Sequence, residues 1–306
     1  MKAGALELSE PFFESTIELF RQRPDPPLEF ETDVNAFVAI MSDVPPQRPR
    51  GVIVHMSRCG STLVLNQLRM ADSVIGLSEA QPVDRIFGWT ASKSAWWSAL
   101  GARTMGSLIG SFALYRGGIA RDVIIKCGVT GTLAMTSVRE QWTNVPIAVL
   151  IRDPIEVVVS NLQSPARWLL EWFRNPRQCR FGLAPPEALS TLEDFCAWIV
   201  GRFCEEVLDR GAAVDIVLDY QDLTPRRVHC IAERFGLKFS PQGEAAFWSG
   251  FEMDAKHPGK TFVKDTVRKQ SAASPSLLTS IERCASKQYI ALKQKYPPTM
   301  FFPDIG

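Results

Sequence analysis

The sequence predicts an α/β fold of three layers, in which a central and mostly parallel sheet is flanked by helices. Short apolar runs at 51–55, 123–125, 147–151 and 216–218 are typical of strands that are buried on both faces. Segments with helical periodicity separate these runs along the chain. Strands that alternate with helices build parallel sheets, so the pattern predicts this fold class.

The first fifty residues predict a helical preface that packs on the core of the protein. Phe12, Phe13, Ile17 and Phe20 recur at nearly helical spacing, which places them on one helix face. Two proline-rich stretches follow this helix and end just before Gly51, where the first strand pattern begins. We therefore expect the preface to end at the first strand.

The later elements follow in the same way. A helix is expected at 62–70, where apolar residues fall on one face, and another begins at Asp153-Pro154. The segment 161–210 is rich in tryptophan, phenylalanine and arginine, and predicts helices that cover the sheet. A further helix begins after Thr224-Pro225 and ends near Gly236.

Composition and length indicate an ordinary globular protein. Hydrophobic residues make up 46% of the 306 residues and charged residues 22%, which excludes disordered and fibrous classes. The formal net charge is +1, which argues against non-specific nucleic-acid binding as the main function. We expect one elaborated α/β domain over 51–306, to which the preface 1–50 is added.

The sequence predicts neither a membrane span nor a metal site. The most apolar run, 145–160, is interrupted by charged residues and a proline, and residues 1–15 lack the apolar segment of a signal peptide. The seven cysteines form no Cys-x-x-Cys pair, and the three histidines have no metal-ligand spacing. We expect a cytoplasmic protein with reduced cysteines, no metal, and no nucleic-acid or membrane partner.

The loop between the strand 51–55 and the following helix has the features of a phosphate-binding site. The first N–H groups of a helix have no partner within it, and the helix dipole favours an anion there. Gly60 lies in this loop, Ser61 and Thr62 add hydroxyl donors, and Arg58 adds a guanidinium suited to phosphate. The loop lacks the lysine of a Walker A motif. An ordinary helix cap is the alternative interpretation of the bare pattern.

The run from Val54 to Leu63 resembles the phosphosulfate loop of sulfotransferases that use 3′-phosphoadenosine 5′-phosphosulfate (PAPS). An arginine in this loop is typical of tyrosylprotein sulfotransferases and of many bacterial members. The resemblance implies a P-loop-type fold and donor contacts from five residues: Arg58, Cys59, Gly60, Ser61 and Thr62. Cys59 stands where the family usually has serine, and a thiol is a weak donor, so the backbone is expected to make that contact.

Three later segments agree with this resemblance in order. Arg152 and Ser160 match the family's 3′-phosphate motif, with the arginine at the end of a strand, where α/β sheets bind ligands. An arginine and a hydroxyl give a phosphate charge-assisted hydrogen bonds. Tyr220 matches a tyrosine that lies near the nucleotide in the family. Lys269 belongs to a basic segment, 256–269, that resembles more loosely the loop closing over the nucleotide; a solvated charged loop is the alternative.

Sulfuryl transfer requires positioning, neutralisation of the leaving phosphate and a base for the acceptor's proton. The tyrosylprotein branch uses a glutamate after the loop helix as this base and a lysine near the leaving oxygen. By spacing and context, Glu79 and Lys126 match these two residues, and Arg58 assists them. Small-molecule members use a histidine instead, for which His55 is the candidate here. We favour Glu79, because His55 precedes the loop arginine.

Two alternatives remain open at this level. A P-loop kinase using ATP and Mg²⁺ would hold the metal through Asp153, and a non-catalytic nucleotide-binding module would lack the base. The acceptor is expected to be a small molecule rather than a protein. Tryptophans with candidate roles in an apolar acceptor pocket, each of which is otherwise a core residue, are Trp89, Trp96, Trp97, Trp168 and Trp172.

Overall fold

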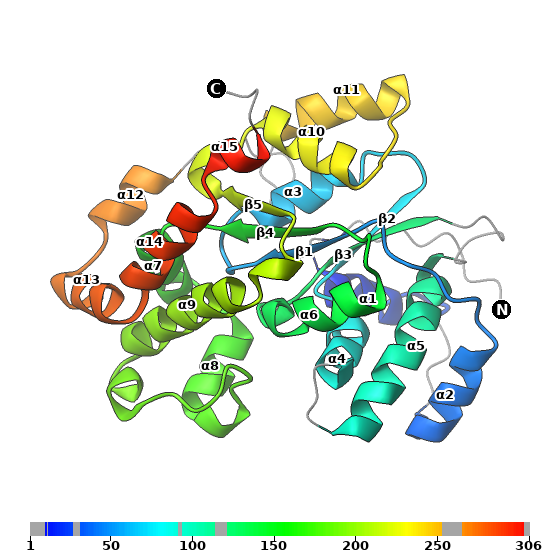
Figure 1. Ribbon diagram of the computed structural model, residues 1–306, viewed down its shortest axis with the longest axis horizontal. Coiled ribbons are helices and arrows are strands. Elements are labelled where there is room, and N and C mark those ends of the chain that lie inside the picture. Colours follow the sequence, from blue (N-terminus) through cyan, green and yellow to red (C-terminus); the bar gives the residue numbers. More distant parts are fainter. Residues whose placement is uncertain are drawn as a thin grey trace.

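The computed structural model describes residues 10, 12–26, 31–90, 94–113, 121–252 and 265–302. It contains a five-stranded sheet in the order β2-β3-β1-β4-β5, and all neighbouring strands are parallel (Figure 1). The strands are β1 (Gly51–His55), β2 (Val74–Ser78), β3 (Asp122–Lys126), β4 (Ile147–Ile151) and β5 (Ile216–Asp219). The predicted α/β class, with a parallel sheet between helices, is therefore confirmed.

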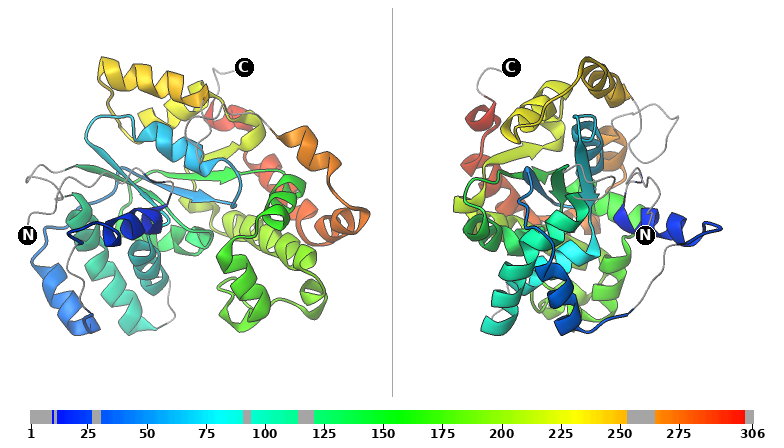
Figure 2. Two further views of the ribbon diagram at one scale, coloured as in Figure 1. Left: turned by 180° about the vertical axis from the view of Figure 1, so that it is seen from behind. Right: turned by 90° about the vertical axis from the view of Figure 1, so that its right-hand side faces the viewer.

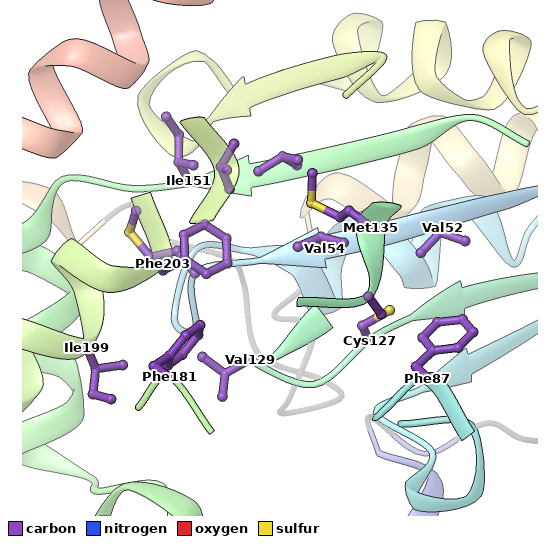
Figure 3. Close-up of a cluster of buried hydrophobic side chains, with 14 of the residues drawn as sticks. Val52, Val54, Phe87, Cys127, Val129, Met135, Ile151, Phe181, Ile199 and Phe203 are labelled. Carbon is purple, nitrogen blue, oxygen red and sulfur yellow. The ribbon is translucent and has the colours of Figure 1, made fainter. Parts of the chain in front are cut away.

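Side chains of the strands alternate between two hydrophobic clusters, one on each face of the sheet. Val52 and Val54 of β1 belong to the larger cluster, whereas Ile53 belongs to the smaller one. Figure 3 shows part of the larger cluster, with Val54 and Ile151 from the strands and Phe203 from a covering helix. Both faces are buried, which explains why the strands are continuous apolar runs rather than alternating ones.

Helices cover both faces of the sheet, as the views in Figure 2 also show. The smaller cluster lies under α3 (Ser61–Leu68), α10 (Pro225–Arg234), α11 (Pro241–Ser249) and α15 (Pro298–Phe301). The larger cluster packs against α4 (Gln81–Thr90), α5 (Ala95–Ala113), α6 (Gly131–Gln141), α7 (Pro154–Gln163), α8 (Arg167–Arg174), α9 (Leu192–Asp209), α13 (Pro275–Ile281) and α14 (Lys287–Lys295). Helices α8 and α9 lie in the segment 161–210, where the sequence predicts them.

Side-chain caps set the starts of two predicted helices. The carboxylate of Asp153 accepts a hydrogen bond from the Ile155 N–H at the start of α7. The hydroxyl of Thr224 accepts one from the Arg227 N–H at the start of α10. In both helices proline follows the capping residue, where its missing N–H costs no helix bond. These starts agree with the sequence prediction.

The preface supplies two helices, α1 (Phe13–Arg21) and α2 (Val34–Ser42), and α2 lies against α5. Phe13 packs edge-on against Phe112 of α5, with ring centroids 5.7 Å apart. The domain boundary at residue 50 stays a prediction. Within the described ranges, no helix is both long and apolar enough to cross a membrane. All seven cysteines are free thiols.

Candidate active site at the carboxyl edge of the sheet

The carboxyl ends of the five strands meet around one cavity, as the sheet topology requires for ligand sites of this fold class. The cavity has a volume of about 620 Å³. Ten of the eleven predicted site residues line it, namely Arg58, Cys59, Gly60, Ser61, Thr62, Glu79, Arg152, Ser160, Tyr220 and Lys269. The eleventh, Lys126, is buried and contacts Glu79 from behind the wall. The structure therefore brings the predicted residues together, while their individual roles stay predictions.

The sheet order separates these residues into two groups. β1 is central and carries the loop with Arg58. On one side of it, Glu79 directly follows β2 and Lys126 is the last residue of β3. On the other side, Arg152 directly follows β4 and Tyr220 directly follows β5. A carboxylate–ammonium pair thus lies on one side of the loop, and an arginine–tyrosine pair lies on the other.

The loop after β1 has an unusual backbone. Ser57 and Arg58 have φ values of 44° and 53°, and Gly60 has a φ of 83°. Left-handed conformations are costly for residues other than glycine and cluster at functional sites. At Gly60 a side chain would also meet the ring of Tyr220, since a Cβ atom there would lie 3.0 Å from Tyr220 Cδ2. Glycine is therefore required where the loop enters α3.

Cys59 belongs to this loop, and its side chain is almost fully buried. Burial raises the pKa of its thiol to about 11, so the residue stays uncharged at neutral pH. A neutral, buried thiol adds no charge to the cavity. It stays a prediction that the backbone at position 59, rather than the Cys59 side chain, contacts a bound anion.

Glu79 forms a compact polar cluster with two buried partners. Lys126 Nζ lies 2.5 Å from Glu79 Oε1 and also donates to the hydroxyl of Ser78 at 3.1 Å. His55 Nε2 lies 3.4 Å from the same Glu79 oxygen. The Lys126 side chain is fully buried, whereas that of Glu79 is 25% exposed toward the cavity. Glu79 is thus the member of this cluster through which its charge reaches the cavity.

Two opposing effects set the charge of this cluster. Burial alone would raise the pKa of Glu79, but the Lys126 ammonium and the His55 ring outweigh it and hold that pKa well below its usual range. Burial lowers the pKa of His55. Its Nδ1 accepts a hydrogen bond from the Ser57 N–H at 3.2 Å, so the neutral ring carries its proton on Nε2, which lies near Glu79 without forming a hydrogen bond of good geometry in the described structure. Glu79 is therefore an ionised carboxylate at neutral pH.

His55 lies closer to Glu79 than the sequence indicates. It is the last residue of β1 and lines the cavity beside Glu79. Only its contact with Glu79 reveals this position, because a strand residue before the loop has no sequence pattern that places it there. The neighbourhood favours a supporting role, in which the ring helps to hold the carboxylate.

Arg152 is the most extensively bonded cation in the cavity wall. Its Nε donates to Glu156 Oε2 at 2.7 Å, its Nη1 donates to the carbonyl oxygen of Arg58 at 3.0 Å, and its Nη2 donates to Asp265 Oδ1 at 2.6 Å. Its Cζ lies 3.8 Å from the centroid of the Tyr220 ring. Burial alone would lower the pKa of Arg152, but the hydrogen bonds that it donates to the carboxylates of Asp265 and Glu156 outweigh burial and raise that pKa. The guanidinium is fixed and charged.

Sequence reasoning missed several residues in the cavity wall and directly behind it. Asp265 and Glu156 pair with predicted cations at helical spacing, four residues from Lys269 and Arg152 respectively, and this spacing is the signal that could have found them. Phe12, which directly precedes α1 in the preface, also lines the cavity, and its ring centroid lies 5.2 Å from Lys126 Nζ. No sequence pattern marks this long-range contact.

Of the five candidate tryptophans, Trp168 lines this cavity. Trp172 belongs to the core, while Trp89, Trp96 and Trp97 pack against one another between α4 and α5. Residues 256–264 of the predicted basic segment lie outside the described residues. Asp153, which the kinase alternative assigns to Mg²⁺, caps α7. In the part of the chain that the structure describes, no cluster of three or more histidine, cysteine or acidic residues could hold a metal.

These features define an α/β protein whose candidate site is built around the loop that joins β1 to α3. No protein-family model matches the sequence, and no curated protein matches it. Among solved structures, the chain is similar to the sulfotransferase STF9 from Mycobacterium avium, with 12% identity, a TM-score of 0.54, and coverage of 86% of this chain and 81% of that one. The chain therefore has the fold of a sulfotransferase, in agreement with the resemblance of its motifs.

Two further solved structures match less well. A sulfotransferase domain from the curacin biosynthetic pathway has 11% identity and a TM-score of 0.44, and covers 81% of this chain and 98% of that chain. A sulfotransferase domain from the Synechococcus PCC 7002 olefin synthase has 15% identity and a TM-score of 0.37, and covers 79% and 96%. We rest the fold comparison on the first structure.

Proposed function

We propose that the protein is a sulfotransferase that moves a sulfuryl group from PAPS to the hydroxyl or amine of a small organic acceptor. The observation that carries this proposal is the single cavity that joins a cationic loop, a second cationic group at Arg152 and Lys269, and the ionised carboxylate of Glu79. A donor with two separate phosphate groups needs two cationic sites. Transfer to an acceptor needs a base beside them.

The residues present fit such a donor. The loop N–H groups, Ser61, Thr62 and Arg58 would hold the 5′-phosphosulfate, and Arg152, Ser160 and Lys269 would hold the 3′-phosphate. Tyr220 already packs against the Arg152 guanidinium and fixes its plane. When bound, PAPS would supply the sulfuryl group, and its nucleotide part would leave as 3′-phosphoadenosine 5′-phosphate (PAP).

Glu79 would act as the base. Its carboxylate accepts the acceptor's proton as the acceptor oxygen or nitrogen bonds to sulfur and the bond from sulfur to the phosphate oxygen breaks. Lys126 lies behind Glu79 and would support the reaction through this carboxylate, which its ammonium group keeps ionised and oriented. Arg58 carries positive charge at the loop, where charge on the leaving phosphate develops.

The acceptor would lie on the apolar part of the wall. Phe12, Val129 and Trp168 line the cavity together with the charged loop. Aromatic and aliphatic side chains beside a few polar groups are typical of small-molecule sites, which supports a small organic acceptor rather than a protein. A cytoplasmic location also remains part of this proposal.

The first prediction concerns ligand preference. The protein should bind PAP more tightly than ADP, because only PAP bears a 3′-phosphate for Arg152 and Lys269. At about 100 times its dissociation constant, a ligand stabilises a protein by about 2.7 kcal/mol, which a thermal-shift titration detects. Equal shifts with both nucleotides, or binding that requires Mg²⁺, would instead favour the kinase alternative.

The second prediction assigns the 3′-phosphate to Arg152. Arg152→Ala should weaken PAP binding roughly tenfold to hundredfold, since a hydrogen bond to a charged group contributes about 1.5–3 kcal/mol, and should change ADP binding much less. Arg139→Ala, which breaks an ion pair with Asp215 away from the cavity, is the matched control. Calorimetric titration measures both; equal losses for PAP and ADP would remove Arg152 from the 3′-phosphate site.

A further inference from the structure

The two cations that would hold the 3′-phosphate already share an anion from the protein itself. Asp265 Oδ1 lies 2.6 Å from Arg152 Nη2, and Asp265 Oδ2 lies 2.9 Å from Lys269 Nζ. Arg268 Nη2 lies 3.4 Å from the same Oδ2 atom. One carboxylate therefore bridges three positive groups, as a bound phosphate would.

The position of Asp265 is accessible from the cavity. Its side chain is 27% exposed and lines the cavity wall, whereas the side chains of Arg152 and Lys269 are 5% and 6% exposed. Glu156, the other carboxylate on Arg152, is also only 6% exposed, and is not among the residues that line the cavity. Asp265 thus covers the two cations on the side from which a ligand arrives, while Glu156 supports Arg152 from within.

Among the described residues, Asp265 makes no other side-chain contact that explains its place. It precedes α12 (Thr266–Ser271) at the N-cap position, but its side chain makes no cap hydrogen bond to that helix. In the part of the chain that the structure describes, the hydrogen bonds and ion pairs of its side chain all go to the three cations. A phosphate brought to Arg152 and Lys269 would meet the negative charge of this carboxylate at hydrogen-bonding distance, which Coulomb repulsion opposes.

We infer that Asp265 is an internal competitor for the 3′-phosphate site, which the phosphate of donor or product must displace from Arg152 and Lys269. This inference rests on the proposed function. Rotation of the Asp265 side chain frees both cations for the phosphate, and its return favours departure of the phosphate. The carboxylate therefore weakens the binding of both PAPS and PAP, and it promotes the release of PAP after each transfer.

The test compares carboxylate-to-amide substitutions at the two residues, Asp265 and Glu156, that pair with Arg152. Asp265→Asn should tighten PAP binding roughly tenfold to hundredfold, since it removes the competing charge, and should change ADP binding less than about threefold. Glu156→Gln makes the same chemical change beneath Arg152, away from the wall, and should not tighten PAP binding. Asp265→Ala is the second variant, and thermal unfolding without ligand verifies that each protein is folded. Calorimetry with PAP, ADP and inorganic sulfate gives the affinities.

The outcomes separate this inference from the proposed function. Weaker PAP binding in Asp265→Asn and Asp265→Ala would mean that the carboxylate orients the cations and would overturn the inference. Equal tightening in Glu156→Gln would reduce the effect to general charge and would also overturn it. If the unmodified protein shows no preference for PAP over ADP, the proposed donor is wrong; tighter sulfate binding in Asp265→Asn would still support the internal competitor, and unchanged sulfate binding would overturn it.

Discussion

Glu79→Gln should lower the turnover number by roughly 10²–10⁴ while leaving the affinity for PAP nearly unchanged. The amide keeps the shape of the side chain but cannot take the acceptor's proton. The residues that we propose for the 3′-phosphate follow β4 and β5, on the other side of β1 from this carboxylate, so PAP affinity should change little. A sulfuryl-transfer assay and a calorimetric PAP titration measure the two quantities separately.

The stability of this variant needs its own control, because Lys126 is fully buried and Glu79 is its anionic partner. Removing one member of a buried pair leaves the other charge uncompensated. The double variant Glu79→Gln with Lys126→Met removes both charges, so it should be more stable than Glu79→Gln alone and equally inactive. Full activity in Glu79→Gln would exclude Glu79 as the base and make His55 the candidate. Loss of PAP binding together with activity would make Glu79 a structural residue.

Lys126→Met should destabilise the protein by roughly 1–3 kcal/mol at pH 7, because a carboxylate loses its charged partner. In the unmodified protein the lowered pKa of Glu79 adds stability above the pKa of the unfolded chain, about 4.3, and this stability is lost as pH falls through the folded pKa. Without Lys126, only the His55 ring still opposes burial, and the pKa of Glu79 should rise. The same residue then destabilises the variant at neutral pH, and acid relieves it.

Two measurements test this reversal. Denaturant unfolding should show a difference between Lys126→Met and the unmodified protein that is large at pH 7 and smaller near pH 4. The acidic limb of the turnover profile should move to higher pH in the variant, since the base protonates earlier. A difference in stability that does not depend on pH would show that Lys126 serves packing rather than the charge of Glu79.

The sequence is sufficient to locate most of this site because of one property of parallel sheets. Glu79 and Arg152 are predicted from the resemblance of their motifs to those of sulfotransferases, and both directly follow strands, so the fold brings them to one edge. The β1 loop adds glycine and an adjoining helix start, which local patterns also indicate. Each of these signals lies within about ten residues.

What could not be read are contacts between distant segments. Asp265 lies 113 residues from Arg152, and nothing in the local sequence tells that one carboxylate joins Arg152 to Lys269. Phe12 reaches Lys126 from the preface in the same way. The burial of Lys126, which changes the pKa of Glu79 and the meaning of a substitution there, depends on the packed structure as a whole.

Because β1 divides the site, its two sides could be altered separately by substitution. Residues from β4 and β5 would set how tightly the nucleotide is held, and residues from β2 and β3 would set how fast an acceptor reacts. Changes on the two sides at residues that share no contact should therefore combine additively in free energy. Acceptor range could then be altered by replacing wall residues such as Phe12 or Val129, with the donor specificity at Arg152 and Tyr220 carried over intact.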